Sequence, residues 1–238
     1  MKTNNIFLDW ICLVLMSLIL YNCALFTLKA NNQHVAPILS IIKPENVKIF
    51  STRSELNISK TEIQYLRVTS DITVDSLITL VNELPSLKYL EIAYGNNFDL
   101  DKLFKNIILS ENISHLYIEN LDTLCGAIGR FKNLEWLGIN NSNLEFLPNE
   151  LSSLYHLKVL NVGYIYKHFG TGNKLNVFPH VILELKNLEV LYMDNNALLH
   201  VPDSICNLTN LKILSLKNNH IGRVPRCLEK SNVELILN

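Results

Sequence analysis

Residues 188–208, LEVLYMDNNALLHVPDSICNL, decide the fold, because regularly spaced leucines are followed by a polar turn and then by a proline. The segment opens with leucines in the pattern L-x-x-L. In the first unit of this pattern Leu66 and Val68 alternate with Tyr65 and Arg67, as in a β-strand with one buried face. Polar residues, including Asn196, then end the strand, and Pro202 begins a piece in which its fixed φ is tolerated. The same order recurs in residues 134–154 and 211–228. Self-similarity at a fixed period indicates a repeat architecture.

These units resemble the leucine-rich repeat, L-x-x-L-x-L-x-x-N-x-L-x-x-L-P-x-x-I-x-x-L. This 23-residue form is similar to the repeat of plant Ras-group-related and animal Ras-pathway scaffold proteins. The resemblance covers Ile63 to the C-terminus, about three-quarters of the chain. It implies an α/β solenoid, a horseshoe with a concave parallel sheet of about seven strands and a convex side of short helical or irregular pieces. It does not name a ligand, because the family binds many unrelated partners.

Seven strands are predicted in residues 63–238, because one repeat cannot bury its leucines alone and stacked repeats form a continuous core. Their first motif residues are Ile63, Leu87, Ile113, Leu134, Leu157, Leu188 and Leu211. The prolines expected on the convex side are Pro148, Pro179, Pro202 and Pro225.

The residue after each strand turn is a second feature of the repeat. The resemblance implies that Asn196 and Asn219 hydrogen-bond the turning backbone, with Ser142 and Asp71 as substitutes in their repeats. Gly95 and Leu121 occupy the same position and lack a side chain suited to this role. The turns of those two N-terminal repeats must therefore be held differently.

Residues 1–30 contain the uncharged run WICLVLMSLILYNCALFTL from Trp10 to Leu28. A cleaved secretion signal and a retained transmembrane anchor both fit it, because about 20 apolar residues cross a bilayer. Residues 20–23, LYNC, also resemble a permissive bacterial lipoprotein box, in which Cys23 is lipidated. All three alternatives give a membrane-anchored or secreted protein, and a cytoplasmic protein with a buried first helix is the minority alternative.

The two ends of the repeat array need caps. Residues 31–62 form the predicted N-terminal capping segment, with a hairpin from residues 46–50 and 55–59. Residues 233–238 are predicted to form a shortened last strand, whose edge is a candidate for self-association. Outside the N-terminal segment the cysteines are Cys125, Cys206 and Cys227. Buried thiols are favoured there, and a disulfide between Cys206 and Cys227 stays open.

The concave face is the predicted binding surface, and six of the nine tyrosines fall on it. Tyrosine and tryptophan combine a large contact area with a polar tip. The predicted ligand contacts are Tyr94, Tyr117, Trp136, Asn141, Tyr164, Tyr192 and Asn195. We expect replacement of Tyr117 and Tyr192 by alanine to weaken partner binding and to leave the fold intact. The alternative, that third-position residues only pack along the sheet, applies to Tyr65, Tyr89, Val159, Val190 and Ile213.

The fifth repeat is 31 residues long, eight more than the 23-residue unit, and the extra segment is residues 165–172. Insertions in solenoids map to loops on one face, which is often the binding face. Tyr166, His168 and Phe169 make this segment a predicted binding loop, although a neutral surface insertion is the alternative.

Several function classes lack their motifs in this sequence. There is no metal-ligand spacing, phosphate loop or catalytic signature. A net charge of −1 gives no electrostatic footprint for nucleic acid. The sequence therefore predicts a non-enzymatic module without cofactor that binds a protein partner, through the concave face, at or outside a membrane. The alternative is a carbohydrate-binding surface protein that uses the same aromatic face, and a stacking unit that self-associates through its last edge is the third hypothesis.

Overall fold

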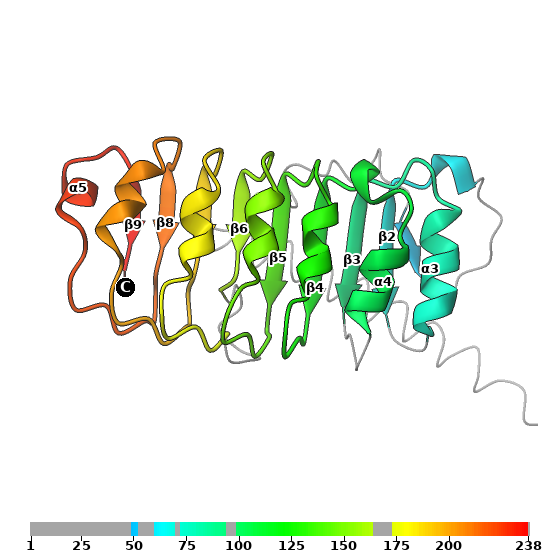
Figure 1. Cartoon of the computed structure of the whole chain (residues 1–238), viewed down its shortest axis with the longest axis horizontal. Helices are drawn as coiled ribbons and strands as arrows, with labels where there is room; N and C mark the ends of the chain where they lie inside the picture. The colour runs from blue at the N-terminus through cyan, green and yellow to red at the C-terminus, as the bar shows by residue number, and fades with distance from the viewer. Residues whose placement is uncertain (1–48, 52–59, 70–71, 94–98, 164–172, 238) are drawn as a thin grey trace, which may run out of the picture. The chain divides into compact units, whose positions relative to one another are not determined.

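A computed structural model describes residues 49–51, 60–69, 72–93, 99–163 and 173–237. The chain divides after Pro44 into two units, and all described residues lie in the second unit. They form one parallel sheet with its strands side by side in chain order (Figure 1). The strands of the described part are β1 (Ile49–Ser51), β2 (Tyr65–Thr69), β3 (Tyr89–Ala93), β4 (His115–Glu119), β5 (Trp136–Asn140), β6 (Val159–Asn161), β7 (Val190–Tyr192), β8 (Ile213–Ser215) and β9 (Glu234–Ile236).

The register of the sheet confirms the seven predicted strands, each of which begins two residues after its first motif residue. Residues at the same motif position lie opposite each other on neighbouring strands, as Tyr117, Gly138, Asn161 and Tyr192 do. β1 and β9 extend the sheet beyond the expected seven strands.

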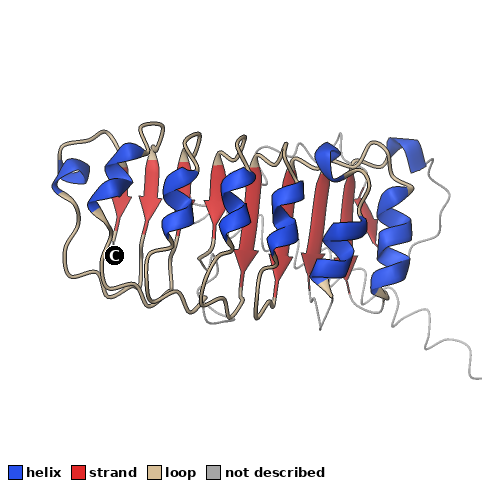
Figure 2. Ribbon diagram, viewed as in Figure 1, coloured by secondary structure: helices blue, strands red, loops and turns tan. Residues whose placement is uncertain are grey.

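The helical segments lie together on one face of the sheet (Figure 2). They are η2 (Lys60–Glu62), α3 (Val74–Asn82), α4 (Leu100–Asn106), η3 (Ser110–Asn112), η4 (Gly126–Arg130), η5 (Asn149–Ser153), η6 (His180–Glu184), η7 (Asp203–Asn207) and α5 (Arg226–Glu229). The four predicted prolines directly precede η5, η6, η7 and α5, which confirms their place on the convex side.

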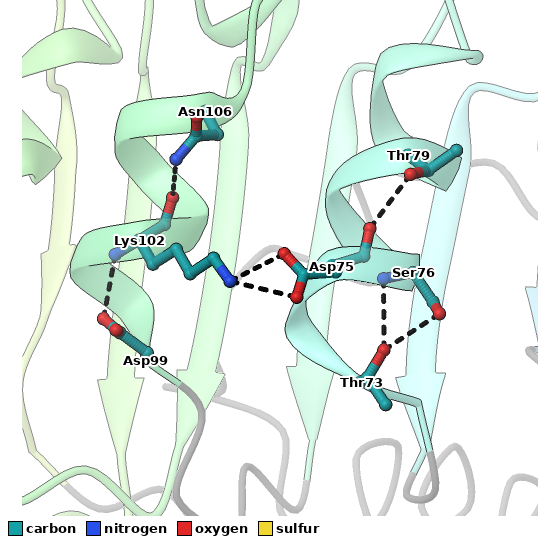
Figure 3. A network of polar contacts seen from close by, with 7 residues as sticks. All are labelled: Thr73, Asp75, Ser76, Thr79, Asp99, Lys102 and Asn106. Carbon is teal, nitrogen blue, oxygen red and sulfur yellow. Dashed lines mark hydrogen bonds and ion pairs between the residues drawn. The ribbon is translucent and has the colours of Figure 1, made fainter.

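The first two repeats carry α-helices instead, and polar side chains cap them. Thr73 Oγ1 accepts a hydrogen bond from the backbone N–H of Ser76, and Asp99 caps α4 in the same way (Figure 3). An ion pair of 2.7 Å between Lys102 Nζ and Asp75 Oδ1 joins the two helices. The pair is solvent-exposed, so its contribution to stability is small and the caps matter more.

Leucines and isoleucines form the core between the sheet and the helices. In each central repeat the strand residue at the fourth motif position is buried; these residues are Leu66, Leu90, Leu116, Leu137, Leu160, Leu191 and Leu214. They belong to one continuous apolar cluster that extends from the first repeat to the last. Each repeat thus completes the core of its neighbours, as in other solenoids.

Buried polar side chains hold the turns that follow the strands, as predicted for Asn196 and Asn219. Asn196 Nδ2 donates to the carbonyl of Met193 at 3.0 Å, and its Oδ1 accepts from the N–H of Leu175 at 3.1 Å. Asn219 makes the equivalent bonds one repeat later. Ser142 substitutes as expected, because its hydroxyl accepts the N–H of Leu121 at 2.9 Å. Asp71 and Gly95 lie outside the described residues.

The fifth repeat fills this position with Asn173, a residue that the motif spacing alone does not predict for this role. Its Oδ1 accepts from Leu144 N at 3.0 Å, and its Nδ2 donates to the carbonyls of Ile139 and Val162 at 2.9 and 2.8 Å. The repeat begins at Leu157, and residues 165–172 are inserted into it. When these eight residues are left out of the count, Asn173 has the ninth motif position. The repeat therefore resumes its regular turn directly after the inserted segment.

The ends of the array differ from the expectation in detail. β1 pairs in parallel with β2, so it adds a strand to the sheet, while residues 55–59 lie outside the described part and the hairpin stays a prediction. β9 confirms the shortened last strand. A disulfide joins Cys206 in η7 to Cys227 in α5, with the two Cα atoms 6.1 Å apart. It ties the last helical segment to the repeat before it.

We expect replacement of Asn173 by leucine to lower the free energy of unfolding by about 3 kcal/mol or more, because buried backbone groups lose their partners. Asn143→Ala is the control, since Asn143 is exposed, and its effect should stay within about 0.5 kcal/mol. Urea denaturation followed by circular dichroism measures both. Equal stability of the two variants would contradict the structural role of Asn173.

Candidate binding surface

The sheet face opposite the helices is the candidate binding surface, and we call it the open face. Side chains alternate along each strand, so the third, fifth and seventh motif positions point to this face when the fourth and sixth point to the core. In β4, for example, Leu116 and Ile118 are buried while His115, Tyr117 and Glu119 are half-buried. The open face is therefore a regular grid of side chains on a rigid sheet.

Aromatic rings form a row over β2, β3 and β4 at the third motif position. The ring centroids of Tyr65 and Tyr89 are 6.5 Å apart, and those of Tyr89 and His115 are 4.6 Å apart. Burial lowers the pKa of His115 below its usual value, which favours the neutral ring. These rings are half-buried, which leaves part of each available for contact with a partner.

Charged groups lie beside this row at the fifth and seventh positions. Arg67 Nε is 3.1 Å from Glu91 Oε1, and Tyr65 donates a hydrogen bond to the same carboxylate. Tyr117 donates to Glu119. Burial raises the pKa of Glu119, and the neighbouring Glu91 raises it further, whereas the bond from Tyr117 lowers it. These contacts hold the charged side chains in place, so the surface presents its charges in a defined arrangement.

The centre of the open face is built around Gly138 in β5. Trp136 leans over this glycine, because an added Cβ atom would lie only 2.3 Å from Trp136 Cη2. The Trp136 ring also stacks with Tyr117 at 6.1 Å and an interplanar angle of 23°. As a result Trp136 is only 2% exposed.

The C-terminal half of the face is more apolar and more closed. Val159, Val190 and Ile213 continue the third position. Tyr192 is 8% exposed, and burial is the main reason that its pKa is raised. Asp194 accepts hydrogen bonds from Ser215 Oγ at 2.6 Å and from the N–H of Lys217 at 2.7 Å.

Asparagines at the eighth position form one rim of the sheet. Asn120, Asn141, Asn195 and Asn218 all have positive φ, between 48° and 59°. Asparagine tolerates this left-handed conformation better than most residues. Asn141 Nδ2 donates to Asn120 Oδ1 at 3.0 Å, and Asn218 Nδ2 donates to Asn195 Oδ1 at 2.9 Å. The motif alone predicts ligand contact for Asn141 and Asn195 and does not reveal this backbone role, although the recurrence of asparagine at the eighth position is its signal.

Solved structures with this arrangement are leucine-rich-repeat proteins. A leucine-rich-repeat protein of Leptospira interrogans superposes with a TM-score of 0.59 at 24% identity, over 74% of this chain and 43% of that chain. An internalin of Listeria monocytogenes gives 0.54 and 27%, over 74% and 48%. Internalin C2 of the same species gives 0.54 and 20%, over 75% and 72%. No protein-family model and no curated protein matches the sequence.

The described part of the chain has the leucine-rich-repeat fold. This finding confirms the predicted solenoid class, with the parallel sheet as one face and the helical pieces as the other. The chain spans less than half the length of the first two solved structures, 43% and 48% of them.

The leucine-rich-repeat sheet brings two of the predicted contacts together, namely Tyr117 and Trp136. Asn141 and Asn195 lie on the rim, and Tyr192 lies in the closed half of the open face. Their role in ligand contact stays a prediction. The remaining predicted site residues lie outside the described part of the structure; they are Tyr94, Tyr164, Tyr166, His168, Phe169 and Cys23.

Within the described residues, no group of three or more histidine, cysteine, aspartate or glutamate side chains is arranged to hold a metal ion. No helix in that part of the chain is long and apolar enough to span a bilayer. The apolar run in residues 10–28 lies outside it, so its role stays a prediction.

We expect Gly138→Ala to lower the free energy of unfolding by about 1–3 kcal/mol, because the new methyl group displaces the Trp136 ring. In a Trp10→Phe background, tryptophan emission should shift to longer wavelength as Trp136 meets water. Gly222→Ala is the matched control, since no atom lies within 4 Å of its added Cβ, and it should change neither quantity appreciably. If Gly138→Ala behaves like the control, Trp136 does not lie over this glycine in solution.

Proposed function

We propose that this leucine-rich-repeat protein is a non-enzymatic module that binds a protein partner through the open face of its sheet. The observation that carries the proposal is the half-buried surface over β2, β3 and β4. It combines an aromatic row with the charged cluster of Arg67, Glu91 and Glu119. Tyrosine and arginine are enriched among the residues that dominate interface energies.

The geometry of this surface suits recognition of a folded or extended polypeptide. Side chains on a sheet hold their positions more closely than side chains on loops. Arg67 and Glu91 are already paired, and Tyr117 already donates to Glu119, so a partner meets charges whose arrangement is fixed in advance. Complementary charge then selects the partner and its orientation.

The carbohydrate alternative has less support from the described residues. A sugar ring stacks on an aromatic face that is open to solvent. Trp136 is 2% exposed and Tyr192 is 8% exposed, so neither offers such a face. The half-buried tyrosines remain available, but they fit a protein interface at least as well.

Tyr117 provides the test of this function. We expect Tyr117→Ala to weaken binding of peptides selected on the wild-type protein from a phage-displayed random library by at least about tenfold. Tyr117 is half-buried, so the variant should still unfold cooperatively. Tyr192 is a poorer test than the sequence suggested, because truncation of its buried ring leaves a cavity.

Tyr155→Ala is the matched control, because Tyr155 follows η5 and is 66% exposed. Isothermal titration calorimetry compares the two variants with the wild type. Equal loss of affinity in both, or binding only to a glycan array, would contradict a protein-binding open face.

The proposal includes a location at or outside a membrane. Its support is the disulfide between Cys206 and Cys227, since disulfides persist in oxidising compartments. The membrane-directing role of residues 10–28 is a part of the same proposal, and the uncharged run is its basis.

We expect peptides containing Cys206 and Cys227 to remain linked when the native protein is digested after alkylation without reductant, while Cys125 is alkylated on unfolding. Replacing Cys206 and Cys227 by serine should lower the free energy of unfolding by about 3 kcal/mol, because the bridge closes a loop of about 20 residues. Mass spectrometry and urea denaturation measure these outcomes. Alkylation of all three cysteines would remove this support for export.

A further inference from the structure

Three side chains of the open face hold polar atoms that are buried and unpaired. Trp136 Nε1, both amide atoms of Asn140 and Nδ2 of Asn161 have no hydrogen-bond partner in the part of the chain that the structure describes. The three residues are 2%, 2% and 1% exposed. Buried polar groups are nearly always hydrogen-bonded, and an unpaired one destabilises the fold. These atoms therefore need an explanation other than stability.

The unpaired atoms are gathered around one glycine. Asn161 lies opposite Gly138 in the register of β5 and β6, and Asn140 follows Gly138 by two residues on the same face. Trp136 precedes Gly138 by two residues and leans over it. Gly138 has no side chain, so the indole nitrogen of Trp136 and the amides of Asn140 and Asn161 surround its position in the sheet.

The donors and acceptors of this cluster specify the chemistry of its occupant. The indole and the two amides offer three kinds of donor, Trp136 Nε1, Asn140 Nδ2 and Asn161 Nδ2, and one acceptor, Asn140 Oδ1. A peptide unit or a carboxamide presents a carbonyl with two lone pairs beside an N–H group. It can pair with Asn140 through both atoms and accept a second bond from Trp136 or Asn161.

The charges on either side exclude other polar groups. Glu119 lies opposite Asn140 on β4. On the other side, the backbone of Asp194 lies beside Gly163, which has the motif position of Asn140 in the next repeat. A carboxylate would be repelled by these two acids. An ammonium group would leave the indole and amide donors unpaired. A neutral amide is not repelled, and its carbonyl can accept from Asn140 and from one of the other two donors.

We propose that Trp136, Asn140 and Asn161 form an amide-recognition subsite, which binds a peptide bond or an asparagine or glutamine side chain of a polypeptide held on the open face. The subsite rests on the proposed protein-binding function and names the chemistry that its partner presents there. Hydrogen bonds formed in such a shielded place are stronger than at an open surface. Because the indole lies over Gly138, it moves when an amide reaches the asparagines.

The first test needs no ligand. If the amide of Asn140 is kept for binding, Asn140→Leu removes an unpaired buried group and should leave the melting temperature unchanged or raise it by about 2–4 °C. Asn173→Leu is the matched control, because the Asn173 amide is fully hydrogen-bonded and its loss should lower the melting temperature. A fall in Asn140→Leu as large as in the control would show a structural role and overturn the proposal.

The second test uses peptides selected on the intact wild-type protein from the random phage library. We expect Asn140→Leu to weaken them by at least about tenfold, and their addition to shift the Trp136 emission in a Trp10→Phe background. Weakening by Tyr117→Ala with full binding to Asn140→Leu would overturn the subsite and leave the protein-binding function in place. If no peptide is enriched, or if only glycans bind, both proposals fail.

Discussion

The stacking of leucines between neighbouring repeats is the constraint on which this structure depends. A single repeat cannot bury Leu137 or Leu160, but the sheet and helices of adjacent repeats enclose both of them fully. The parallel register that achieves this also aligns equal motif positions from strand to strand. The core therefore determines the opposite face as well, because every residue that alternates with a buried leucine points to the open face.

The buried asparagines keep the core regular even where a repeat is longer than its neighbours. Asn173 and Asn196 bond the backbone of their own turn and of the preceding repeat through the same amide atoms. Because these bonds begin after the inserted residues, an extra eight residues in the fifth repeat do not change the pairing of β6 with β7. A solenoid with such turns can vary its surface segments while its sheet stays intact.

The sequence predicted the strands, their register and the proline-led convex pieces, because leucine spacing and proline chemistry act locally. It could not predict the burial of Trp136, which follows from the absence of a side chain at Gly138 two residues away. It also missed the left-handed conformation of Asn141 and Asn195, since a rim asparagine and a ligand-binding asparagine look alike in a motif. Asn173 was hidden by the insertion. These roles depend on neighbouring residues and on the insertion, and the repeat motif does not specify either.

The two halves of the open face present polar groups differently: one half holds paired carboxylates and the other holds an unpaired amide. Over β2 to β4 the carboxylates of Glu91 and Glu119 have partners, so this surface is stable before any ligand arrives. At β5 and β6 the amide of Asn140 has none among the described residues. An apolar residue at that position would leave no buried amide without a partner, and Leu137 and Ile139 would still anchor β5 in the core. An asparagine there is consistent with a fold that gives up some stability for hydrogen bonds that only a bound molecule can complete.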